Sequence, residues 1–107
     1  MTTFDERTKA FEQKFAHDAE LAFKVTARRN KLLGLWAAKL MANQVSDEAY
    51  AKEIVIADFE APGEEDVLAR IMKDFAAANV ALTEKDVRLE MRRLMEVAKQ
   101  QLMEEAA

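Results

Sequence analysis

The 107-residue sequence has no cysteine, and its only histidine is His17. Without cysteine neither disulfides nor thiolate metal sites can form, and one histidine cannot build a histidine-rich metal centre. Two glycines and one proline also leave few residues for the turns that strand-rich folds need. Helix-forming Ala, Glu, Lys, Leu and Met dominate instead, so we expect a single all-α domain.

Long apolar runs are missing too. The longest is "LLGLWAA", residues 32–38, whereas a membrane-spanning helix needs about 20 apolar residues. The first residues include acids and no apolar run, so a secretory signal is not expected. These features predict a cytoplasmic protein without direct membrane insertion.

Catalytic patterns are absent as well. The chain has no cysteine nucleophile, no Ser–His pair at a meaningful spacing and no glycine-rich phosphate loop. We therefore expect neither enzymatic activity nor a cofactor. The net charge is −4, with +4 on residues 19–45 and −6 on residues 46–79. An acidic chain with one short basic segment argues against nucleic-acid binding and allows a charged protein partner.

The sequence predicts four helices in a bundle. The first runs from about Asp5 to Met41, and the others follow Ser46, start at Glu64 and begin near Thr83. Ser46 is the expected N-cap of the second helix, which "APG" (61–63) ends. Asn79 is a left-handed C-cap candidate, and Thr83 with Asp86 resembles a capping box. Short connections favour antiparallel neighbours.

The N-terminal stretch "FDERTKAFEQKFAHD" carries a phenylalanine stripe, Phe4, Phe11 and Phe15, within about 40° on a helix. A continuous first helix would span about 55 Å, against about 22 Å for each of the next two, so its first part is expected to be flexible or overhanging. The stripe either packs on the last helix of the same chain or binds a partner's groove. The residues alone leave both alternatives open.

Arg28, Arg29 and Lys31 form a basic cluster in the sequence "ARRNK". The cluster either docks on an acidic surface or is a solvated helix face that pairs with the acidic middle segment. His17 is more simply a contact residue of the N-terminal segment than a pH switch. Consecutive acids at 64–66 point in different directions on a helix, so they predict a favourable helix-end charge and not a metal site.

Three blocks of the chain resemble the zeta subunit family of alphaproteobacterial F-type ATP synthases. They are "KFAHDAELAFKVTARRNKLLGLWAAKLM" (14–41), "AYAKEIVIADFEAPGEEDV" (49–67) and, more loosely, "LTEKDVRLEMRRLMEVA" (82–98). His17, Asn30 and Gly34 make the first block specific, because a generic helix would not need them. The family's pattern has glycine near the end of the first helix and at the end of the third, where this chain has Ala42 and Asn79.

The resemblance implies a four-helix bundle that inhibits ATP hydrolysis by the catalytic head of the ATP synthase. A flexible segment, residues 1–18, would become a helix and enter the interface between catalytic and rotor subunits, as in the mitochondrial inhibitor protein. Residues 19–107 would form the bundle, a monomer when free and peripheral to the inner membrane when bound. The alternative is a non-inhibitory helical adaptor or a bundle that binds a small ligand. The expected partner-binding residues are Phe4, Asp5, Arg7, Phe11, Lys14, Phe15, His17, Asp18, Arg28, Arg29 and Lys31.

Overall fold

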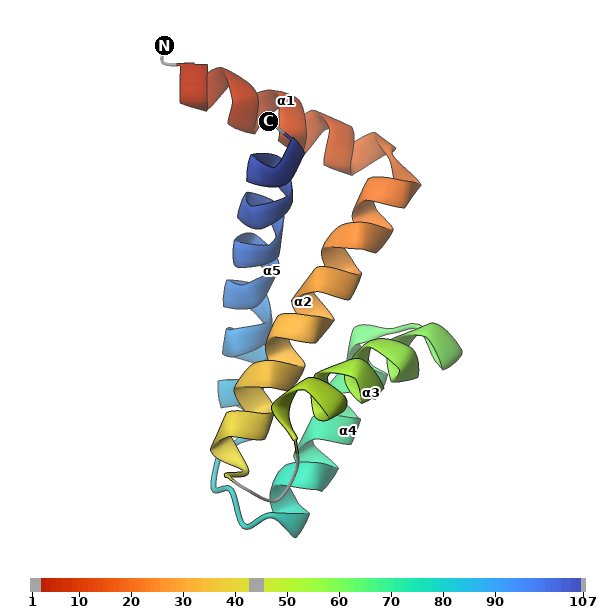
Figure 1. Ribbon diagram of the computed structural model, residues 1–107, viewed down its shortest axis with the longest axis vertical. Coiled ribbons are helices and arrows are strands. Elements are labelled where there is room, and N and C mark those ends of the chain that lie inside the picture. The colour runs from red at the N-terminus through yellow and green to blue at the C-terminus, as the bar shows by residue number, and fades with distance from the viewer. Residues whose placement is uncertain (1–2, 43–45, 107) are drawn as a thin grey trace.

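The computed structural model describes residues 3–42 and 46–106, with side chains from 6–42 and 46–105. Within these ranges the chain is all-helical and has no strand, which confirms the predicted fold class (Figure 1). Five helices are present where four were expected. Their bounds are α1 Thr3–His17, α2 Ala19–Leu40, α3 Asp47–Glu60, α4 Glu64–Ala77 and α5 Glu84–Ala106.

The prediction of one continuous helix from Asp5 to Met41 is wrong, because the chain turns at Asp18. Asp18 has an extended backbone (φ −113°, ψ 102°), and its carboxylate accepts a hydrogen bond from the Leu21 backbone N–H at 3.1 Å. Asp18 is therefore the N-cap of α2. The stretch 24–31 is polar, but it lies inside α2 and does not break the helix.

The boundaries of α3, α4 and α5 confirm most of the predicted helix signals. Ser46 holds the N-cap position of α3, although its side chain makes no capping hydrogen bond to the described residues. Thr83 and Asp86 form the reciprocal box: the Thr83 N–H donates to the Asp86 carboxylate at 2.9 Å, and the Asp86 N–H donates to the Thr83 hydroxyl at 3.2 Å. Val45, the expected hydrophobic staple of α3, lies outside the described residues.

Left-handed backbone occurs at two non-glycine positions among the described residues. Ala42 has φ 37° and Asn79 has φ 60°. Asparagine tolerates this conformation better than alanine, whose Cβ crowds the backbone at a cost of about 1–2 kcal/mol. Both helix ends therefore turn as glycine would turn them, and Ala42 carries the greater strain.

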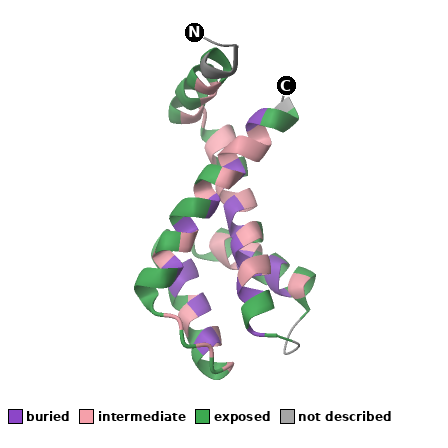
Figure 2. Ribbon diagram, turned by 90° about the vertical axis from the view of Figure 1, so that its left-hand side faces the viewer, coloured by how far each residue is buried: buried purple, intermediate pink, exposed green. Residues whose placement is uncertain are grey.

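The core lies between α2, α3, α4 and α5. In Figure 1, α2 and α5 run side by side in opposite directions, α3 crosses α2, and α4 returns from the end of α3. Figure 2 shows the buried residues concentrated between these helices. The largest fully buried hydrophobic side chains are Phe75, Leu33, Ile54, Ile71, Met91, Val25, Val67 and Val87.

Gly34 sets the distance between α2 and α3. A Cβ at Gly34 would lie 2.6 Å from the Cα of Ala51 and 3.2 Å from its Cβ. Real Cβ atoms do not approach a backbone carbon so closely, so only glycine allows this crossing. Gly34 is thus a close-packing residue of the core, in a helix where glycine otherwise costs about 1 kcal/mol relative to alanine.

Candidate partner-binding site

Helix α1 lies across the neighbouring ends of α2 and α5, outside the core (Figure 1). None of its described side chains, residues 6–17, is buried, and Figure 2 colours these residues only as exposed or intermediate. Phe11 and Phe15 are its half-buried aromatic residues. The side chains of Phe4 and Asp5 lie outside the described residues.

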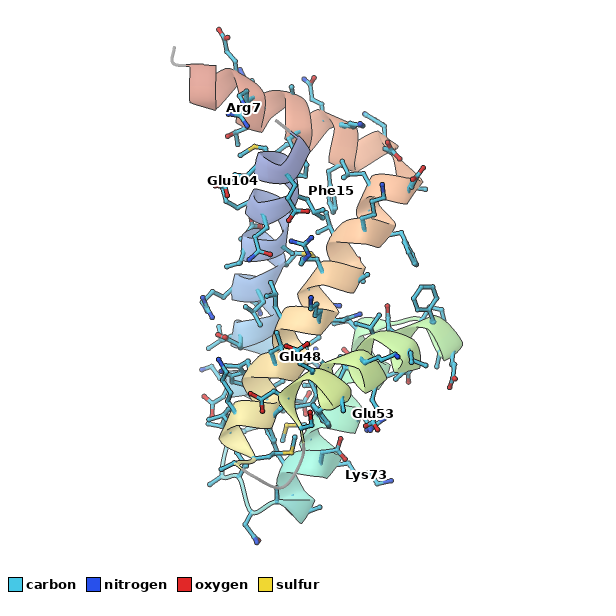
Figure 3. All side chains as sticks on the ribbon, in the orientation of Figure 1. Arg7, Phe15, Glu48, Glu53, Lys73 and Glu104 are labelled. Atoms are coloured by element: carbon cyan, nitrogen blue, oxygen red, sulfur yellow. The ribbon has the colours of Figure 1, made fainter. Side chains whose placement is uncertain are left out.

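Lys99 of α5 is the principal contact of α1. Its Nζ lies 4.4 Å from the centre of the Phe15 ring and 3.7 Å from the Glu12 carboxylate. Figure 3 shows Phe15 projecting from α1 into the angle between α2 and α5. The Lys99 side chain is 16% exposed and also lies 3.7 Å from Glu96. A cation over an aromatic face contributes about 0.5–2 kcal/mol, depending on how dry the site is.

A small cavity remains where the middle of α1 meets α5. It measures about 80 Å³, and Thr8, Phe11 and Met103 are among the residues that line it. The buried Thr8 hydroxyl has no hydrogen-bond partner among the described residues. A buried polar group without a partner costs about 1–3 kcal/mol. The contact surface of α1 on α5, which we call the seat of α1, is therefore incompletely packed and incompletely hydrogen-bonded.

The remaining predicted residues of the N-terminal segment differ in exposure. Arg7, Lys14 and His17 are exposed on α1, so their side chains are accessible to a partner. Asp18 is half-buried and caps α2, a structural role that the sequence reasoning did not assign to it. A contact role for these four residues stays a prediction.

The expected basic cluster of Arg28, Arg29 and Lys31 does not form one exposed surface. Arg28 makes two hydrogen bonds to Glu105, at 2.6 and 2.9 Å, and a third to Gln101 at 2.8 Å. This pairing raises the pKa of Arg28 and lowers that of Glu105. Arg28 thus ties α2 to the end of α5, and only Lys31 is exposed.

Arg29 is the most buried residue of this cluster. Its side chain is 4% exposed, its Nε donates to the Asn30 Oδ1 at 2.8 Å, and its Nη1 lies 3.8 Å from Glu64. Burial lowers the pKa of Arg29, and the nearby carboxylate of Glu64 opposes that effect. Such burial leaves the guanidinium little surface for a partner. Glu64 belongs to the acidic middle segment, residues 46–79. This contact is therefore the internal pairing that the sequence offers as an alternative to docking on a partner.

Two further kinds of feature, a metal-ion site and a membrane-spanning helix, are absent from the described residues. They include no group of three acidic, histidine or cysteine residues that could hold a metal ion. None of the described helices is both long and apolar enough to cross a membrane. The candidate site is α1 together with the part of α5 that it contacts.

Comparison with known proteins places this surface in context. No curated protein matches the chain at a significant level. A family model described as ATPase inhibitor subunit zeta matches residues 1–101, which cover nearly the whole chain, including α1 to α4 and most of α5. The chain therefore belongs to the ATPase inhibitor subunit zeta family.

Proposed function

We propose that this protein inhibits ATP hydrolysis by the catalytic head of an F-type ATP synthase. Residues 1–18 insert as a helix at the interface between the catalytic subunits and the rotor, and block rotation. The observation that carries this proposal is α1 itself: a formed helix with two aromatic side chains on one face and none of its described side chains in the core. Family membership supports an inhibitory role, and α1 supplies the segment that performs it.

The position of α1 supports its release onto a partner. To leave α5, the helix gives up the contacts of Phe15 and Glu12 with Lys99, and none of its described side chains is fully buried. The unpaired Thr8 hydroxyl and the small cavity make the resting seat weaker than a complete interface. A partner groove that fills the space around Phe11 can therefore compete with α5.

The mechanism needs no chemistry from the inhibitor. A helix wedged between moving subunits has only to bind one rotational state more tightly than the others. The free protein is a monomer that works on the cytoplasmic side and becomes peripheral to the membrane when it binds the enzyme. The exposed Arg7, Lys14 and His17 add polar contacts around the two aromatic anchors.

Substituting Phe11→Ala and Phe15→Ala together tests the proposal. We expect the concentration for half-inhibition to rise by about 100-fold or more, because aromatic anchors typically carry about 2 kcal/mol or more each. The measurement is ATP hydrolysis by the cognate catalytic head at increasing inhibitor concentration. The matched control is Lys9→Ala with Gln13→Ala, two exposed residues of the same helix, which should inhibit like the unmodified protein. Binding of the unmodified chain without inhibition would instead favour a non-inhibitory adaptor.

Lys99→Ala should make the protein a stronger inhibitor. Removing the cation that holds Phe15 and Glu12 weakens the resting seat by about 1 kcal/mol, so half-inhibition should occur at a concentration about 2- to 10-fold lower. Amide exchange in α1 should rise at the same time. Lys85→Ala, an exposed position of α5, is the control and should change neither quantity. Faster exchange without stronger inhibition would show that the seat does not compete with the enzyme.

A further inference from the structure

A second surface, separate from the seat of α1, lies between α2, α3 and α5. It is a groove of about 530 Å³, with Phe23, Val55 and Leu102 as its apolar lining and Lys24, Arg28 and Lys31 as its basic lining. We call it the Phe23 groove. The cavity beside α1 is lined from α5 by other residues, among them Lys99 and Met103. The N-terminal helix therefore does not fill the Phe23 groove.

One exposed aromatic ring, that of Phe23, lines the groove, and a second, that of Phe59 in α3, packs against it. Phe23 is 51% exposed and Phe59 is 57% exposed, and their rings meet edge to face with centroids 5.0 Å apart. Neither ring belongs to the core, so the fold does not require phenylalanine at either position. Because both rings are half-exposed, covering them with a partner is favourable by about 25 cal/mol for each Å² of apolar area buried. Rigid aromatic pairs of this kind are typical anchors of protein interfaces.

The charge around the groove defines the partner's chemistry. The protein has a net charge of −4, yet three cations and one acid, Glu105, line this groove. Glu105 pairs with Arg28, and Lys24 lies 3.3 Å from Glu20, one turn away. Lys31 is exposed and makes no ion pair with any of the described residues. The occupant that complements this surface is an amphipathic segment with an apolar face and flanking carboxylates.

We propose that the Phe23 groove docks an acidic amphipathic segment of the ATP synthase, as a second anchor beside α1. This inference rests on the proposed function, since the same enzyme supplies both contacts. Two linked contacts bind more tightly than either alone, because the first holds the second at a high effective concentration. The second anchor therefore lowers the concentration at which the inhibitor works, whereas α1 is the contact that blocks rotation.

Two sets of substitutions in the full-length chain test the groove: Phe23→Ser with Phe59→Ser, and Lys31→Glu alone. All three positions are exposed, so the core should fold unchanged. We expect the double substitution to raise the half-inhibitory concentration about tenfold or more, with full inhibition still reached at saturation. Lys31→Glu should raise it less, and by a smaller factor at high salt. Leu89→Ser is the matched control: Leu89 is 51% exposed on α5 but does not line the groove, and its loss should have no effect.

The outcomes separate this inference from the proposed function. If the unmodified chain does not inhibit, the proposed function fails before the groove is tested, so binding of each variant to the head is measured as well. If the unmodified chain inhibits and the groove variants inhibit at the same concentration, the second anchor is wrong. If sedimentation shows that the unmodified chain self-associates and the groove variants do not, a second copy fills the groove and the inference is overturned.

Discussion

A chain lacking residues 2–17, with Met1 joined directly to Asp18, is expected to lose inhibition of ATP hydrolysis completely. The deletion removes α1 and both of its described aromatic anchors, Phe11 and Phe15. Its core should unfold at nearly the same temperature, because none of the described α1 side chains is buried and Asp18 still caps α2. Inhibition assays with the cognate catalytic head and thermal unfolding by circular dichroism measure the two halves of this prediction.

A second truncation isolates the role of Asp18. Deleting residues 2–18 removes the carboxylate that accepts from the Leu21 N–H, so the core should lose about 1 kcal/mol of stability. Inhibition should be absent in both truncations. Residual inhibition by the shorter chain would place the inhibitory element in the core helices, and collapse of the fold would make α1 part of the core.

Gly34→Ala is expected to destabilise the protein by about 1–3 kcal/mol, although alanine is the better helix former by about 1 kcal/mol. The new methyl would meet the Ala51 Cα at 2.6 Å, and a backbone atom cannot move away by changing rotamer. Helix α3 must therefore shift away from α2, and the packing of Tyr50 and Ile54 must shift with it. For a domain of this size, the melting temperature should fall by roughly 10 °C.

Two companion variants make the Gly34 test specific. Lys31→Ala, at an exposed position one turn earlier in α2, should change stability by less than about 0.5 kcal/mol. Adding Ala51→Gly to Gly34→Ala removes the 3.2 Å contact but leaves the 2.6 Å contact, so stability should recover only in part. An unchanged melting temperature for Gly34→Ala would mean that α2 and α3 do not cross so closely.

Helices α3, α4 and α5 could be predicted from the sequence because their signals are local. Pro62 ends one helix, Asn79 ends the next, and the box of Thr83 and Asp86 begins the last. The break at Asp18 was missed because the residues on both sides favour helix, and helix propensity is only a weak prior. An N-capping residue followed by Glu20 in the first turn was the available signal.

Only the part of the candidate site on α1 could be predicted, because its aromatic residues follow helical periodicity. The spacing of Phe11 and Phe15 identified their shared face, whereas Lys99 is 84 positions from Phe15 and no local pattern connects them. The burial of the Arg29 side chain could not be predicted for a different reason. Its neighbours suggest a solvated face, but the way α2 packs turns it inward beside Asn30 and toward Glu64. Burial of a cation depends on tertiary structure, which a charge run does not encode.

The one-residue joint at Asp18 limits how far the protein can reach. Because only Asp18 separates α1 from α2, α1 can move only as a rigid helix about this joint. The helix is about 22 Å long at 1.5 Å per residue. Its tip can sweep only a sphere of that radius around the start of α2. In the proposed function, the core must therefore come within the length of α1 of the surface that this helix binds, so binding of α1 also brings the core beside the enzyme.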